Sequence, residues 1–141
     1  MNSNKTKSWI QFVDFFESIS CLTKISAHNF KNNDNLNKHL RSFYVSVLDI
    51  NNAFIKTYYD IRNGKDIPVN LDTFVIPTLS VNDIDNTDKL KLLMEDTIKN
   101  THEPLEYILS CIPNSKNSDI SYLETSINEF IKAINDVDTI L

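Results

Sequence analysis

The longest regular feature of this sequence is a series of apolar positions separated alternately by four and three residues. Its members are Leu36, Leu40, Phe43, Val47, Ile50, Phe54, Thr57 and Ile61. This heptad spacing places all of them on one face of an α-helix. The pattern predicts a helix over residues 35–63, about 40 Å long at about 1.5 Å per residue. A helix of that length is typical of a helical bundle.

The only glycine of the chain, Gly64, comes directly after this pattern, and Pro68 follows shortly. Glycine readily adopts the left-handed conformation that closes a helix, and a proline soon afterwards keeps the helix from resuming. Gly64 is therefore predicted to end the helix. A chain with one glycine cannot build a P-loop or a G-x-G-x-x-G dinucleotide site, since both need several glycines close to phosphate.

Two further apolar patterns predict helices at the ends of the chain. A helix over residues 119–140 is predicted by a three-and-four spacing, whose positions are Ile120, Leu123, Ile127, Phe130, Ile134, Val137 and Leu141. Residues 8–22 carry a shorter stripe formed by Trp9, Phe12, Phe16 and Ile19. Ser8 and Gln11 are spaced as a capping box for this first helix. The helix is expected to fade near Thr23, where turn-forming residues replace the periodicity.

A fourth helix is predicted over residues 87–112, although Pro104 lies in the middle of its apolar stripe. A proline inside a helix removes one hydrogen bond and costs about 3 kcal/mol, whereas in a first turn it costs little. The two arrangements that fit are a helix bent at Pro104 and a break at residues 100–102 capped by Thr101. The register of the stripe continues past the proline, which favours a bent or briefly interrupted helix.

Residues 65–86 form the one long connection of the chain, and they are too apolar for a solvated loop. Since long structureless segments are uncommon in compact domains, this crossover is predicted to pack across the bundle with a short strand or a helical turn. The predicted fold is all-α: an up-and-down four-helix bundle, formed as a single domain by residues 1–141, with the crossover between its second and third helices.

The net charge of −5 is unevenly distributed along the chain. Residues 1–65 carry nine Lys or Arg and five Asp or Glu, a net +4, while residues 66–141 carry five and fourteen, a net −9. An acidic surface repels nucleic acid and speeds the encounter with basic partners. A basic protein partner is therefore predicted, and no nucleic-acid partner.

The cellular setting is predicted from what the sequence lacks. It has no apolar run long enough to cross a bilayer and no apolar segment typical of a secretion signal, so neither a membrane partner nor export is expected. Cys21 and Cys111 are isolated thiols, which are typical of a reduced cytoplasmic protein, with a single disulfide between them as the alternative.

Catalytic and metal-binding motifs receive little support from the sequence. There is no G-x-S-x-G elbow, and no histidine lies near either cysteine, so the chain is not expected to be an enzyme or to hold a cofactor. No Glu-x-x-His pair is present for a di-iron bundle. A three-histidine metal site formed by His28, His39 and His102 is kept as a third hypothesis, although exposed histidines near helix ends are the commoner arrangement.

The densest acidic cluster contains Asp83, Asp85 and Asp88, with Glu95 two turns further along the predicted helix. A calcium loop is excluded here because the sixth position lacks glycine and the twelfth lacks glutamate. These four residues are predicted to contact a basic partner. Charge alone gives little affinity, so apolar residues of the crossover, Phe74 and Val75, are predicted as anchors.

Together these features favour a small acidic cytoplasmic protein that acts by stoichiometric contact with another protein. An inhibitor, an antitoxin, an immunity-type protein or a regulator from a virus or mobile element would fit. The alternative is a structural module whose long apolar seams pair between two chains as a homodimer.

Overall fold

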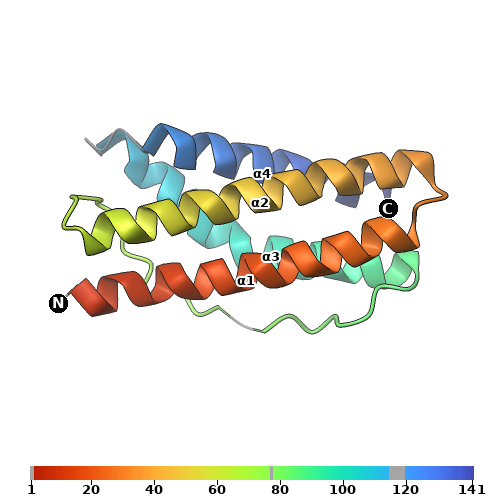
Figure 1. Ribbon diagram of the computed structural model, residues 1–141, viewed down its shortest axis with the longest axis horizontal. Coiled ribbons are helices and arrows are strands. Elements are labelled where there is room, and N and C mark those ends of the chain that lie inside the picture. The colour runs from red at the N-terminus through yellow and green to blue at the C-terminus, as the bar shows by residue number, and fades with distance from the viewer. Residues whose placement is uncertain (1, 77, 115–119) are drawn as a thin grey trace.

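The structure, a computed structural model, describes residues 2–76, 78–114 and 120–141. Four α-helices make up most of it: α1 (Asn2–Asn29), α2 (Asp34–Arg62), α3 (Thr87–Cys111) and α4 (Ile120–Ile140). A short 3-10 turn, η1 (Ile112–Asn114), follows α3. The described residues contain no strand, and the prediction of an all-α four-helix bundle is confirmed (Figure 1). None of these helices is long and apolar enough to cross a membrane, as far as the described residues show.

Helix α1 is longer than predicted at both ends, running from Asn2 to Asn29. The expectation that it would fade near Thr23 is wrong. The hydroxyl groups of Thr23 and Ser26 are buried and donate to the carbonyl oxygens of Ile19 and Leu22, each at 2.7 Å. Because the helix itself satisfies these hydroxyl groups, residues that often form turns continue the helix here.

Helix α2 begins and ends with capping interactions. The side chain of Asn33 accepts a hydrogen bond from the backbone N–H of Leu36 at 3.2 Å. At the other end Gly64 has a φ of +83°, its N–H donates to the carbonyl of Ile61 and the N–H of Lys65 donates to that of Asp60. This pair of bonds is a Schellman motif, so the predicted role of Gly64 is confirmed.

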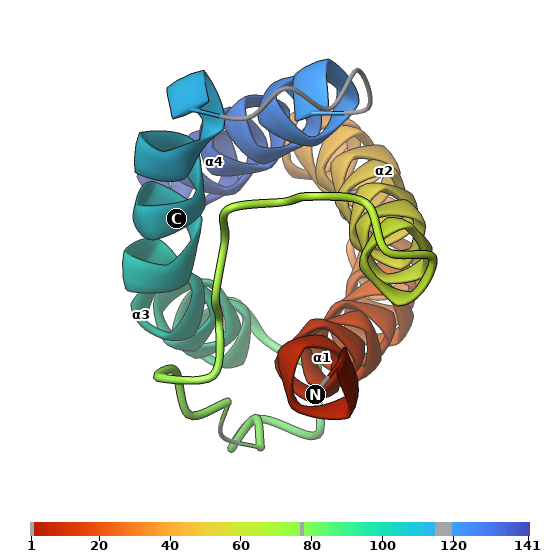
Figure 2. The ribbon, with the colours of Figure 1, turned by 90° about the vertical axis from the view of Figure 1, so that its left-hand side faces the viewer.

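Helix α3 continues through Pro104 and changes direction in its second half (Figures 1 and 2). The hydroxyl group of Thr101 donates to the carbonyl of Thr97 at 2.7 Å, as a residue inside a helix does, so Thr101 does not cap a new helix. The predicted bend is therefore the arrangement found, and the predicted break is not. The fourth helix was expected to start at Asp119, which lies outside the described residues.

The helices are arranged in a ring in which α1 packs on α2, α2 on α4 and α4 on α3 (Figure 2). Aromatic rings fill the centre, and Phe16 joins three helices there. Its ring centroid lies 5.1 Å from that of Phe54 in α2 and 5.6 Å from that of Phe130 in α4. All three side chains are fully buried.

The crossover, residues 63–86, first runs across the end of the bundle from α2 toward α3 and then lies along the fourth side of the ring, between α1 and α3 (Figure 2). Near its start Ser8 donates to the Asp72 carboxylate at 3.2 Å, and near its end the Asn29 side chain donates to the Ile84 carbonyl at 2.7 Å. The crossover therefore runs alongside α1 in the same direction (Figure 1). It returns the chain to the end of the bundle where α2 begins, so α2 and α3 run in the same direction. Among consecutive helices, only the pairs α1–α2 and α3–α4 run in opposite directions.

The prediction that this crossover packs on the bundle is confirmed. Its buried apolar side chains belong to the main core and are Val69, Leu71, Leu79, Val81 and Ile84. A short strand or a helical turn was expected in it, and its described part, residues 63–76 and 78–86, contains no strand and no helix. A turn closed by the Phe74 N–H on the Leu71 carbonyl, at 3.0 Å, is its clearest local structure.

Candidate functional site

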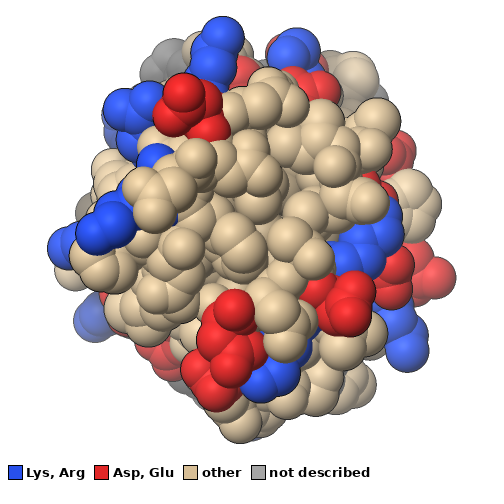
Figure 3. Space-filling model, turned by 90° about the vertical axis from the view of Figure 1, so that its right-hand side faces the viewer, with Lys and Arg blue, Asp and Glu red and all other residues tan. Residues whose placement is uncertain are grey.

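The predicted acidic cluster lies at the end of the bundle where α3 begins. Two of its carboxylates are paired with a lysine of the same region: Lys89 Nζ lies 3.0 Å from Asp85 and 3.7 Å from Asp83. Asp88 is exposed in the first turn of α3, where a carboxylate favours the positive end of the helix. Figure 3 shows this end of the molecule, where acidic and basic side chains alternate around an uncharged centre.

The pairing with Lys89 changes the titration of both groups. The hydrogen bond from the Lys89 ammonium group lowers the pKa of Asp85 below its ordinary 3.8, and the same bond raises the pKa of Lys89 above 10.5. A carboxylate whose pKa is lower in the folded state stabilises the fold at neutral pH and loses this contribution as the pH falls through the lowered pKa. Because both groups are exposed, the gain is small.

Replacing Lys89 with glutamine is expected to raise the pKa of Asp85 toward 3.8, since the donated hydrogen bond and the nearby positive charge are both lost. The measurement is an NMR titration of the side-chain carboxyl carbons. Lys91→Gln is the matched control, because Lys91 pairs with Asp138 on α4 and should leave Asp85 unchanged. An Asp85 pKa that does not respond to Lys89→Gln would show that the pair does not form in solution.

The two predicted apolar anchors differ in their surroundings. Phe74 is half-buried against Tyr107 of α3, with ring centroids 5.6 Å apart. Val75 is 89% exposed, the most exposed large apolar side chain in the described structure. Both line a hollow beside the start of α1, together with Lys7, Ser8, Gln11, Asp72 and Ile76.

The structure does not bring the six predicted residues into one surface. Phe74 and Val75 lie near Ser8, whereas Asp83, Asp85 and Asp88 lie near Asn29, at the other end of α1. Glu95 lies about two turns further along α3. Twenty-one helical residues separate Ser8 from Asn29, which is roughly 30 Å at about 1.5 Å per residue. A single compact partner segment cannot contact both groups, so the acidic cluster and the apolar anchors must be considered separately.

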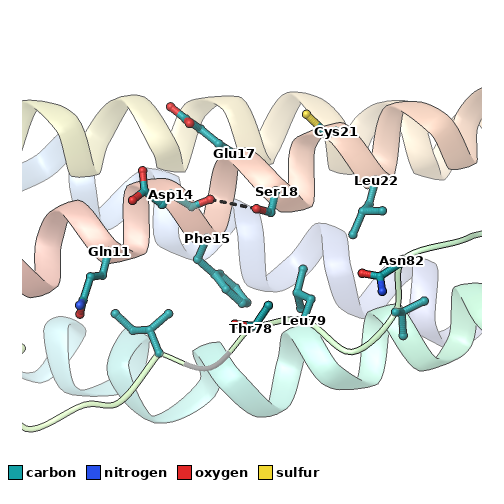
Figure 4. Close-up of a pocket in the computed structure, with 12 residues that line it drawn as sticks. Gln11, Asp14, Phe15, Glu17, Ser18, Cys21, Leu22, Thr78, Leu79 and Asn82 are labelled. Carbon is teal, nitrogen blue, oxygen red and sulfur yellow. Dashed lines mark hydrogen bonds between the residues drawn. The ribbon is translucent and has the colours of Figure 1, made fainter.

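An open groove with a volume of about 750 Å³ lies between α1 and the crossover (Figure 4). Phe15 and Leu22 point from α1 toward the crossover, and Leu79 points back from the crossover. Val81 and Ile76 add to the apolar lining. The floor of the groove is therefore apolar and is formed by two segments that are far apart in the sequence.

The charged side chains that line this groove are both acidic. Asp14 and Glu17 come from α1 and lie along its outer rim, with Glu17 pointing away from the crossover (Figure 4). The polar lining is otherwise uncharged: Gln11, Ser18, Thr78 and Asn82. The groove thus combines an apolar floor with a negative rim, which is a suitable environment for an apolar segment that carries Lys or Arg.

The crossover brings a second property to this groove. Among the described residues, no backbone–backbone hydrogen bond involves positions 75–76 or 78–83. Backbone N–H and C=O groups that lack partners can pair with those of another chain. Sequence reasoning identified the crossover as apolar but missed the groove, because the α1 residues that form its other wall follow an ordinary amphipathic pattern.

The metal site predicted as a third hypothesis, formed by His28, His39 and His102, is not found in the described structure. His28 and His102 are exposed on α1 and α3, and His39 Nδ1 lies 2.8 Å from the backbone carbonyl oxygen of Asn35 within α2. In the described part of the chain no three His, Cys, Asp or Glu side chains gather as a metal site would require. Cys21 and Cys111 are free thiols, so the alternative of a disulfide between them is not found.

The fold is that of an all-α four-helix bundle, with an open groove between its first helix and a long crossover. Comparison with known proteins gives no match to a family model, to a curated protein or to a solved structure. Its function is therefore inferred from its own residues.

Proposed function

We propose that this chain is a small acidic binding protein that acts by stoichiometric contact, and that the groove between α1 and the crossover is its partner site. The observation that carries the proposal is an apolar floor, formed by Phe15, Leu22 and Leu79, beside two acidic side chains, Asp14 and Glu17, which are the charged residues among the described lining. An inhibitor, antitoxin, immunity-type protein or mobile-element regulator would use such a site to hold a segment of its target.

The partner segment is proposed to be extended and to alternate apolar residues with Lys or Arg. Side chains alternate on the two sides of an extended chain, so apolar ones can enter the groove while basic ones approach Asp14 and Glu17. The unpaired backbone of the crossover would supply main-chain hydrogen bonds. Val75, at the end of the groove near Gln11 and Ile76, would add apolar contact.

Selection of peptides from a random displayed library against the intact protein tests this proposal. The enriched peptides are expected to alternate apolar residues with Lys or Arg, and to bind more weakly as salt is raised. Changing both Asp14 and Glu17 to lysine should lower the affinity for the selected peptides by about tenfold or more. The basic residues of the peptides would then face positive charges instead of negative ones.

The matched control changes Asp88 and Glu95 to lysine, which alters the net charge equally on α3. If the groove is the site, this second variant keeps its affinity apart from a small long-range effect. Loss of binding only in the α3 variant would place the partner at the acidic cluster predicted from the sequence. Enrichment of acidic peptides would refute a basic partner altogether.

A further inference from the structure

The outer face of α2 carries a second stripe at heptad spacing, separate from the one that faces the core. Its positions are Arg41, Val45, Leu48, Asn52, Ile55, Tyr59 and Arg62. They are separated alternately by four and three residues, like the buried set. Val45 is 56% exposed, Leu48 39% and Tyr59 55%, so this stripe faces solvent over about 21 Å at about 1.5 Å per residue.

This stripe is not needed for the fold. The buried positions of α2 already face α1 and α4, and of the apolar outer residues only Ile55 packs partly against the core. Solvent-facing helix positions are normally polar, so several large apolar side chains at heptad spacing indicate a surface that another helix covers. Heptad spacing specifies a helix in particular, since it matches the seam between two packed helices.

The charges beside the stripe specify the partner further. Four cationic side chains lie on this side of α2, all of them exposed: Lys38, Arg41, Lys56 and Arg62. The neighbouring carboxylate on α2 is Asp49, and Glu129 and Asp136 of α4 lie across a shallow cleft, where Asp136 is paired with Lys132 at 2.9 Å. The four exposed cations of α2 outnumber its three carboxylates, Asp34, Asp49 and Asp60, and Asp60 is buried and paired with Lys65 at 3.3 Å. This balance favours acidic groups on the partner.

A second copy of this chain fits the stripe poorly. In a parallel pair Arg41 would face Arg41 and Arg62 would face Arg62 of the other copy. In an antiparallel pair centred on Asn52, Arg41 would face Arg62. Either arrangement brings like charges together at both ends of a short seam, which opposes association.

We propose that the outer face of α2 is a docking site for an amphipathic helix of a partner protein whose apolar stripe is flanked by Asp or Glu. This site lies on a different helix from the groove and takes a partner of opposite charge. Together with the groove, on which the proposed function rests, it would give the protein a second binding surface. Asn52, in the middle of the stripe, favours a partner with a polar residue at the facing position.

A synthetic helical peptide of about 20 residues tests the proposal, with Leu at its a and d positions, one central Asn, and Glu at e and g. A second peptide replaces each Glu with Lys. Fluorescence anisotropy with the intact protein, at concentrations where the peptides are monomeric, should show binding of the Glu peptide that weakens with salt. The Lys peptide should bind at least about tenfold more weakly.

Substitutions locate the binding on α2. Leu48→Asp and Val45→Asp should each lower the affinity for the Glu peptide by about tenfold or more. Each substitution removes an apolar contact and adds a negative charge that repels the peptide. Leu92→Asp is the matched control, because Leu92 is 53% exposed on α3, and it should keep the affinity. Circular dichroism spectra of the three variants should coincide with that of the parent protein.

Three results would overturn the proposal. The first is equal binding of the Glu and Lys peptides. The second is equal loss of binding in Leu48→Asp and Leu92→Asp. The third is sedimentation of the parent protein as a dimer that Leu48→Asp converts to a monomer, which would assign the face to a second copy. The peptide selection that tests the groove is independent of these measurements. A negative result for the α2 face would therefore not refute the proposed function of the groove.

Discussion

Replacing Phe16 with alanine is expected to lower the free energy of unfolding by about 3–5 kcal/mol. Phe16 is fully buried, and its ring packs edge-on against Phe54 of α2 and Phe130 of α4. Its loss would leave a cavity where three helices meet, and the neighbouring rings cannot close it without moving whole helices. Denaturant unfolding followed by circular dichroism at 222 nm measures the change.

The matched control for this substitution is Ile25→Ala in the same helix. Ile25 is 50% exposed, so its truncation should change the free energy of unfolding by no more than about 0.5 kcal/mol. If Phe16→Ala cost as little as Ile25→Ala, α1 would not be packed against α2 and α4 as described, and the arrangement of the core would be refuted.

Replacing Leu71 with alanine is expected to cost about 2–5 kcal/mol, although it lies in a segment without helix or strand. Leu71 is fully buried, and so is Ile84 further along the crossover. The physical reason is that the crossover fills the side of the bundle between α1 and α3, where no helix does. Thermal and denaturant unfolding should both report the loss in one cooperative transition.

Val75→Ala is the control within the same segment, because Val75 is 89% exposed. It should leave the free energy of unfolding within about 0.5 kcal/mol of the parent value. A crossover that unfolds separately would show a different result: Leu71→Ala would then leave the main transition unchanged and only increase hydrogen exchange in residues 63–86.

Most of the secondary structure was predictable because apolar periodicity reports directly on which residues face a core. The heptad series from Leu36 to Ile61 placed α2 to within one residue at each end. Prediction failed for the end of α1, where Thr23 and Ser26 resemble turn residues in sequence. Only the folded helix shows that their hydroxyl groups are satisfied by carbonyls one turn earlier.

The candidate site was less predictable, because a site depends on distances between segments that are far apart in the chain. Acidic residues that are close in sequence suggested one negatively charged cluster. In the structure Lys89 pairs with two of them, Asp83 and Asp85, and offsets part of that charge. Phe74 and Val75 were named as partners of that cluster and lie roughly 30 Å away, near the other end of α1. The groove itself arises only where Phe15 and Leu22 meet Leu79.

The sequence by itself determined that the chain forms helices, where α2 ends and that the crossover packs on the bundle through its apolar residues. Each of these follows from local spacing, one glycine and apolar content. Tertiary structure alone decided the direction of the crossover along α1, the parallel course of α2 and α3, and the groove. These depend on which apolar faces meet, and several helix arrangements bury the same residues about equally well. Contacts between residues far apart in the sequence, such as those of Ser8 with Asp72 and Asn29 with Ile84, are found only in the folded arrangement.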